Sequence, residues 1–120
     1  MKHLICSLLL VVVAFTANAQ QKRDLVLNDK TELIDAVIYH DNGQVAQKGS
    51  YTQDGKLHGT WISYNAAGEK TAVAEYSNGL KTGVWLFYQG DTLKEVTYSN
   101  NAITQVNTWA MQDTRVVSND

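Results

Sequence analysis

The sequence predicts an all-β protein, an elongated single-layer antiparallel β-meander built from about three β-hairpin repeats of 24 residues each. The first observation is the spacing of the only three tryptophans, which fall 24 residues apart at Trp61, Trp85 and Trp109. The second is that all six tyrosines join this scheme, with Tyr39, Tyr64 and Tyr88 opening the units and Tyr51, Tyr76 and Tyr98 near their middles. The third is composition, because strand-forming residues dominate the segments between turns and proline is absent.

Residues 1–19 have the pattern of a secretory signal peptide. A basic start at Lys2 is followed by an apolar stretch from Leu4 to Phe15 and by small residues at Ala17-Asn18-Ala19. The apolar stretch is too short for a comfortable membrane span, and no second one follows, so we expect no integral membrane span in the mature chain. The pattern predicts an exported protein, periplasmic or extracellular, whose mature chain begins at Gln20.

Residues 20–35 are predicted to form N-terminal capping strands. Leu25, Val26 and Leu27 are followed by a polar turn at 28–30, after which an apolar segment runs from Leu33 to Ile38. The repeats are predicted to occupy residues 36–109, and a C-terminal tail residues 110–120.

Each unit is predicted to be one hairpin plus the turn to the next unit. Glycines mark the same joints, Gly55 with Gly79 and Gly59 with Gly83, and Asp54-Gly55 and Asn78-Gly79 are suited to tight turns.

Alternation within the strands predicts which side chains share a face. Ala72, Ala74 and Tyr76 should point one way, and a four-residue turn at 65–68 would place Trp61 opposite Ala72. The residue two before each mid-unit tyrosine is small or modest, at Gly49, Ala74 and Val96. Large indoles are therefore expected to lie over small neighbours, although a single bulge would reverse the faces.

The repeated scheme Y-x(3)-G, a second Y, then N/D-G-x(2 or 3)-G-x-W resembles the MORN-repeat variant of bacterial antitoxin-like proteins. The resemblance covers residues 36–109, and the third unit departs from it because Asn101 and Asn107 replace glycines. A degenerate last unit is typical of a capping repeat. The resemblance implies recognition of a membrane or a partner rather than catalysis.

Charge and cysteine content exclude several classes of partner. The chain has 10 Lys and Arg and 12 Asp and Glu, and loss of Lys2 leaves 9 minus 12, or −3. Such a chain has no basic patch for nucleic acid or for an anionic membrane. The single cysteine, Cys6, lies in the predicted signal peptide, so no disulfide is expected.

The sequence contains no recognisable catalytic or metal-binding motif. Relatives of this kind sometimes carry a nucleotidyltransferase label, but His58-Gly59 stands alone without the histidine pair that such chemistry requires. Only His40 and His58 would survive processing, which is too few for a metal site. We therefore expect no enzyme, no cofactor and no metal.

The candidate partner-binding residues are Tyr39, Tyr64 and Tyr88. At two strands per repeat they would recur about every 9.6 Å, a pitch suited to an extended glycan or peptide strand. The competing interpretation is that all nine aromatic residues of the scheme are structural, together with Gly55, Gly59, Gly79 and Gly83. The predicted function is an exported non-catalytic β-repeat module that binds a protein or an envelope glycan. The alternative is an antitoxin-like protein of a toxin–antitoxin pair.

Overall fold

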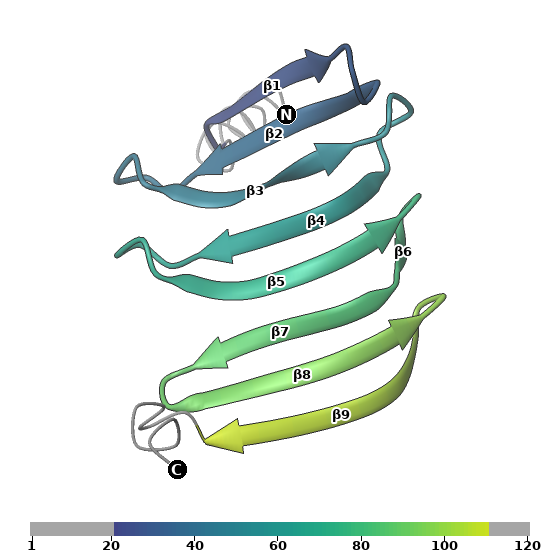
Figure 1. The fold of residues 1–120 in the computed structure, drawn as a ribbon. Helices are drawn as coiled ribbons and strands as arrows, with labels where there is room; N and C mark the ends of the chain where they lie inside the picture. Colours follow the sequence, from purple (N-terminus) through teal and green to yellow (C-terminus); the bar gives the residue numbers. More distant parts are fainter. Residues whose placement is uncertain (1–20, 111–120) are drawn as a thin grey trace, which may run out of the picture.

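The computed structural model describes residues 21–110, which form nine β-strands and no helix (Figure 1). The predicted signal peptide and residues 111–120 of the predicted tail lie outside the described residues. The strands are β1 Arg23–Asn28, β2 Leu33–Tyr39, β3 Val45–Tyr51, β4 Leu57–Tyr64, β5 Lys70–Ser77, β6 Leu80–Lys81, β7 Gly83–Gln89, β8 Thr92–Ser99 and β9 Ala102–Ala110.

All nine strands belong to one open antiparallel sheet whose spatial order follows the chain. The order is β1-β2-β3-β4-β5-β7-β8-β9 (Figure 1). The short β6 pairs with the end of β5, and β7 pairs with the middle of β5. The predicted fold class, a single-layer β-meander of hairpins, is confirmed. β1 lies in the predicted capping segment 20–35, whereas β2 crosses its boundary and ends at Tyr39, and β3–β4, β5–β7 and β8–β9 form the three hairpins.

Two of the hairpins close through tight two-residue turns. Asn78 and Gly79 have φ of 49° and 85°, and Asn100 and Asn101 have φ of 48° and 72°. Positive φ at both central residues is the type I′ geometry, which suits the twist of a hairpin. The third unit therefore turns as the second does, with asparagine where the second has glycine. The predicted Asp54-Gly55 turn is longer, since the amide of Thr52 donates to the carbonyl of Lys56 at 2.7 Å.

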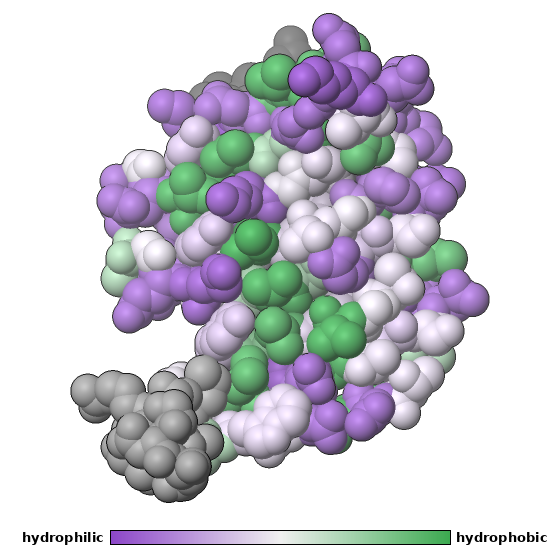
Figure 2. Space-filling model, viewed as in Figure 1, coloured by the Kyte–Doolittle hydropathy of each residue, from purple (hydrophilic) through white to green (hydrophobic). Residues whose placement is uncertain are grey.

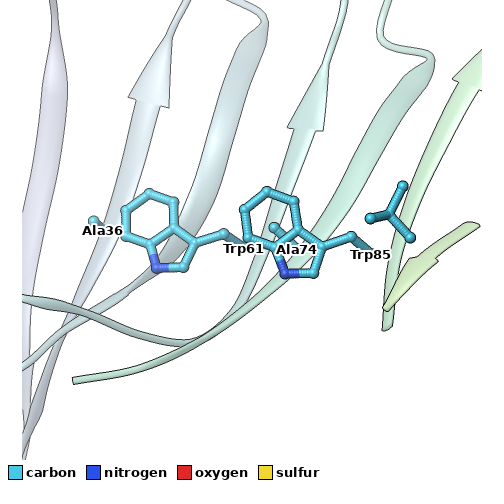
Figure 3. Close-up of a cluster of buried hydrophobic side chains, with 5 residues drawn as sticks. Ala36, Trp61, Ala74 and Trp85 are labelled. Atoms are coloured by element: carbon cyan, nitrogen blue, oxygen red, sulfur yellow. The ribbon is translucent and has the colours of Figure 1, made fainter. Parts of the chain in front are cut away.

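One face of the sheet carries the core, and we call it the tryptophan face. Its buried row crosses the strands and consists of Ala36, Trp61, Ala74, Trp85 and Val96 (Figure 3). The Trp61 indole lies flat on Gly49, since a Cβ added there would be 2.2 Å from the ring. The indole nitrogens reach main-chain carbonyls, with Trp61 Nε1 donating to Ser50 at 2.9 Å and Trp85 Nε1 to Glu75 at 3.0 Å. A single sheet thus buries two of its three indoles, Trp61 and Trp85, against backbone and small residues, as predicted.

The predicted register of the second unit was wrong by two residues. Trp61 pairs with Ala74, whereas Ala72 pairs with Ser63. The turn is one residue longer than expected, because the amide of Asn65 donates to the carbonyl of Glu69, and the ladder also shifts next to Tyr64. A displacement by an even number keeps every side chain on its predicted face.

The third unit differs from the first two in the size of its bulge. Between β3 and β4, residues 59–61 lie opposite Gly49 alone, and between β5 and β7, residues 82–85 lie opposite residues 74–75. Each of these bulges adds two residues and preserves the facing. Between β8 and β9 only Thr104 is extra, and a one-residue shift reverses the facing. Trp109 therefore pairs with Leu93 on the opposite face and remains 47% exposed.

Candidate functional site

The second face of the sheet carries the three candidate tyrosines, and we call it the tyrosine face. Tyr39, Tyr64 and Tyr88 each directly follow a residue of the tryptophan face, so alternation points them the other way. They lie at or next to the ends of β2, β4 and β7 (Figure 1). These strands run in the same direction, so all three tyrosines lie at the same end of the strands, which we call the tyrosine edge. All three are half-buried.

Two of these tyrosines are held by charged neighbours. The Tyr39 hydroxyl donates to the Asp24 carboxylate at 2.8 Å, and this hydrogen bond raises the pKa of Tyr39, with smaller contributions from desolvation and from the Asp24 charge. Lys22 Nζ lies 5.9 Å from the Tyr39 ring centroid, and Lys48 Nζ lies 5.8 Å from that of Tyr64. An ammonium group at this distance is attracted to the aromatic face. The rings are thereby oriented while part of each remains open to solvent.

An apolar row runs across the tyrosine face beside these rings, and the sequence reasoning did not single it out. Val37 and Ile62 flank Lys48 in register, and Val73 and Leu86 continue the same line across β5 and β7. Figure 2 shows this face, with hydrophobic side chains gathered in a stripe that crosses the strands. The unbroken apolar runs at 36–39 and 84–87 were the signal that could have found it, because such a run places apolar side chains on both faces of its strand.

Shallow hollows accompany both faces. On the tyrosine face, one of about 220 Å³ is lined by Tyr64, Lys48 and Val45, and one of about 320 Å³ by Val37, Ile62 and their neighbours. On the tryptophan face, a hollow of about 250 Å³ is lined chiefly by Tyr51, Trp61, Tyr76, Trp85 and Phe87. These are open surface sites that suit an extended ligand better than an enclosed small molecule.

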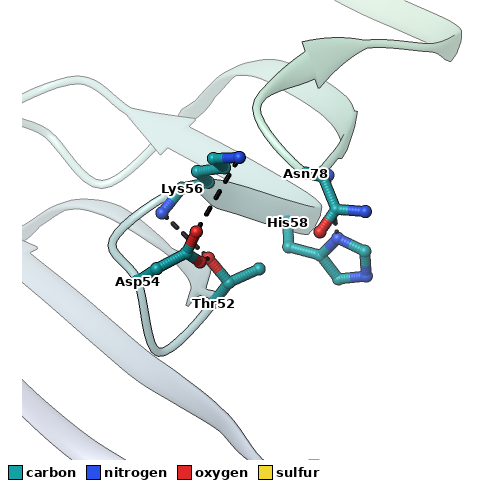
Figure 4. Close-up of polar contacts among 5 residues, drawn as sticks. All are labelled: Thr52, Asp54, Lys56, His58 and Asn78. Atoms are coloured by element: carbon teal, nitrogen blue, oxygen red, sulfur yellow. Dashed lines mark hydrogen bonds and ion pairs between the residues drawn. The ribbon is translucent and has the colours of Figure 1, made fainter.

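His58 has a structural role. Its Nδ1 accepts a hydrogen bond from the amide of Asn78 at 3.0 Å, which joins β4 to the turn of the next hairpin (Figure 4). The neighbouring acid also has a turn role, because the Thr52 hydroxyl donates to Asp54 and lowers the pKa of that carboxyl. Lys56 Nζ lies 3.7 Å from the same carboxylate (Figure 4). The polar residues around the first unit's turn thus bind one another and the backbone.

His40 makes an analogous link. Its Nε2 lies 2.8 Å from the carbonyl of Tyr64, and the Asn42 side-chain amide donates to the carbonyl of Ala66 at 2.9 Å. Residues 24 positions apart are therefore tied together at the edge that carries the tyrosines. Within residues 21–110, no three histidine, cysteine or acidic side chains gather as metal ligands would, and no helix there is suited to crossing a membrane.

The repeat residues lie where turns and bulges need them. Gly59 and Gly83 have φ of 82° and 70° at the two-residue bulges, and Gly55 and Gly79 have φ of 90° and 85° in the turns. Trp61 and Trp85 are buried, whereas Trp109 is on the other face.

Fold and faces together define the chain as a single-layer β-repeat protein with an aromatic surface on each side. No protein-family model, no curated protein and no solved structure matches it.

Proposed function

We propose that this chain is an exported, non-catalytic β-repeat module that binds a protein partner or a cell-envelope polymer through its tyrosine face. The observation that carries the proposal is the periodic placement of Tyr39, Tyr64 and Tyr88 at one edge, on alternate strands about 9.6 Å apart. An extended ligand laid along that edge would meet an aromatic ring at each step.

The surroundings of the tyrosines support binding. Tyrosine gives a large, rigid contact area with a polar tip at low entropic cost. The apolar row of Val37, Ile62, Val73 and Leu86 extends the contact surface, and Lys48 adds one positive charge within it. A surface with aromatic and apolar anchors and a few polar groups is typical of protein and polymer recognition. The resemblance of the repeats to the MORN variant supports the same function.

The proposal that the chain is non-catalytic rests on the hydrogen bonds that its polar side chains already make. His58 and Asp54 both take part in hydrogen bonds of the turns. Neither lines any of the three hollows described above.

Export is supported by the signal-peptide pattern at 1–19 and is tested by mass spectrometry of the protein recovered from its cell. A chain that begins at Gln20 is the expected result. An intact Met1 on a cytosolic product would overturn the export proposal and favour the antitoxin-like alternative.

Binding is tested with a variant that carries Tyr39→Ser, Tyr64→Ser and Tyr88→Ser. We expect it to lose retention on two probes presented separately, peptidoglycan sacculi and detergent-solubilised envelope proteins, or on whichever one retains the wild type. Ile103→Ser is the matched control, since Ile103 is 58% exposed and pairs with Tyr98 on the tryptophan face. The corresponding Tyr→Phe triple variant keeps the rings and should retain most of the binding.

Circular dichroism separates binding from folding. A folded serine variant that binds as well as the wild type would exclude the tyrosine edge as the site. If the serine variant unfolds, the single Tyr64→Ser and Tyr88→Ser variants replace it, and undiminished binding by both would contradict the proposal.

A further inference from the structure

The large apolar side chains that stay exposed are concentrated in the two outermost strands. Among the described residues, six of the eight lie there, three in β1 and three in β9: Leu25, Val26, Leu27, Ile103, Val106 and Trp109. The other two are Leu80 and Val84. Exposed apolar surface concentrated in this way marks an interaction site.

Both outer strands also present unpaired backbone groups within residues 21–110. The amide of Tyr39 donates to the carbonyl of Lys22, so alternation turns the amides of Leu25 and Leu27 away from β2. At the other end, the sequence of β9, AITQVNTWA, contains neither a charged residue nor a proline. Sheet edges are normally protected by charges, prolines or short length, and β9, with nine residues, has none of these devices.

We propose that β9 of one copy pairs with β1 of a second copy, so that the sheet continues from chain to chain. The sheet path holds an even number of antiparallel strands, so β1 and β9 run in opposite directions (Figure 1). A second copy placed below the first in the same orientation therefore brings its β1 antiparallel to β9. This is the relation that already joins β2 to β3, β4 to β5 and β7 to β8.

The buried row of the tryptophan face fixes the register of the junction. Leu25 pairs with Ala36 at one end of that row, and Val106 pairs with Val96 at the other. Leu25 and Val106 are 50% and 51% exposed, because each has a neighbour on one side only. Placing Leu25 opposite Val106 continues the row through the junction and covers both side chains.

The same register is favourable on the tyrosine face. With Leu25 opposite Val106, antiparallel counting places Lys22 opposite Trp109. An ammonium group beside an indole face is an attractive pair, and Lys22 already lies 5.9 Å from the Tyr39 ring centroid. No pair of like charges meets across the junction, because β9 carries no charge.

A two-fold pairing of β9 with β9 is less favourable than this head-to-tail contact. It would cover Val106 and Trp109 but leave the three apolar side chains of β1 exposed. Head-to-tail contacts that do not close generate open assemblies. Because β1 has only six residues, the junction buries less than the roughly 1,200 Å² of a stable interface, so we expect association at high protein concentration only.

The experiment is sedimentation velocity of the purified chain, in the form recovered from the cell, over a wide concentration range. We expect the wild type to grow beyond a dimer as concentration rises. Leu25→Lys alone and Val106→Glu alone should each suppress this growth at the junction. Leu25→Lys combined with Val106→Glu places opposite charges across the proposed register and should recover association. Val84→Lys, at an exposed position of an inner strand, should sediment as the wild type does.

Three outcomes would overturn the proposal. The first is a wild type that stays monomeric at the highest concentration, which would mean that other residues of the chain cover the edges. The second is a wild type that stops at a dimer sensitive to Val106→Glu but not to Leu25→Lys, which would establish the two-fold pairing. The third is failure of the double variant to recover association although circular dichroism shows it to be folded.

Discussion

The indole of Trp61 occupies the space that a side chain at Gly49 would need. A Cβ at that position would lie 2.2 Å from Trp61 Cδ2. Gly49 is not among the glycines of positive φ, so its requirement is steric and not conformational. Gly49→Ala should therefore reduce the free energy of unfolding by the upper part of the roughly 1 to 3 kcal/mol range for overpacking. Urea melts of Gly49→Ala measure this loss.

The control for Gly49 is a double-mutant cycle. In a Trp61→Ala background the obstructing ring is gone, so Gly49→Ala should cost little there. Additive losses in the cycle would show that the two residues do not interact.

The tryptophans should differ in their contribution to stability. Trp85 is 7% exposed and contacts the rings of Tyr76, Phe87 and Tyr98, so Trp85→Ala should cost roughly 3 to 5 kcal/mol. Trp109 is on the opposite face and 47% exposed, so Trp109→Ala should cost less than about 1 kcal/mol. Thermal or urea melts test the ranking, and acrylamide should quench Trp109 fluorescence preferentially. Equal losses would contradict the reversal of facing at Thr104.

His58→Ala should remove one structural hydrogen bond and no catalytic group. The amide of Asn78 loses its acceptor at an exposed position, which should cost about 0.5 to 1.5 kcal/mol. A loss as large as that of Trp85→Ala, measured in the same urea melts, would mean that the histidine has a role beyond the turn.

The turn of the third unit should tolerate glycine but not alanine. Asn101 has φ of 72°, which glycine adopts freely, but its Oδ1 also accepts the amide of Lys81 at 2.7 Å. Asn101→Gly should therefore change stability by less than about 1 kcal/mol, since relief of strain offsets the lost hydrogen bond. Asn101→Ala loses the hydrogen bond and also forces an alanine into positive φ, so it should cost roughly 1 to 3 kcal/mol. The contrast is measured by chemical denaturation, and equal effects of both substitutions would refute it.

Alkaline pH should destabilise the fold. Burial, and to a smaller extent the neighbouring Tyr98, raises the pKa of Tyr76, so the folded state holds this proton more tightly than the unfolded state. The stabilisation is complete below about pH 10, the ordinary tyrosine value, and is lost as pH rises towards the raised pKa. Melting temperatures from pH 8 upwards should fall less steeply for Tyr76→Phe than for the wild type. An identical pH dependence would remove Tyr76 as the cause.

The sequence predicted the strands and turns well because both depend on short-range features. Strand-forming residues, glycine at positive φ and a regular spacing of tryptophan fix the hairpins without reference to the rest of the chain. The small residues at Gly49 and Ala74 predicted where indoles lie, since a flat ring needs a flat surface.

Bulge size was not predictable, and it decided which face of the sheet carries Trp109. One extra residue at Thr104, compared with two at the earlier bulges, moved Trp109 to the tyrosine face. The apolar row of Ile62, Val73 and Leu86 was missed for a related reason. Its residue types are those of an ordinary core, and only the register reveals that they share an uncovered face.

The chain-ordered sheet also determines how the molecule responds to tension. Strands pair only with their neighbours in the chain, apart from β7, which pairs with β5 past the two-residue β6, and β1 and β9 lie at opposite edges (Figure 1). A force applied at these two strands pulls across the ladder and loads one hydrogen bond after another, as in opening a zipper. Extension should therefore proceed hairpin by hairpin at low force.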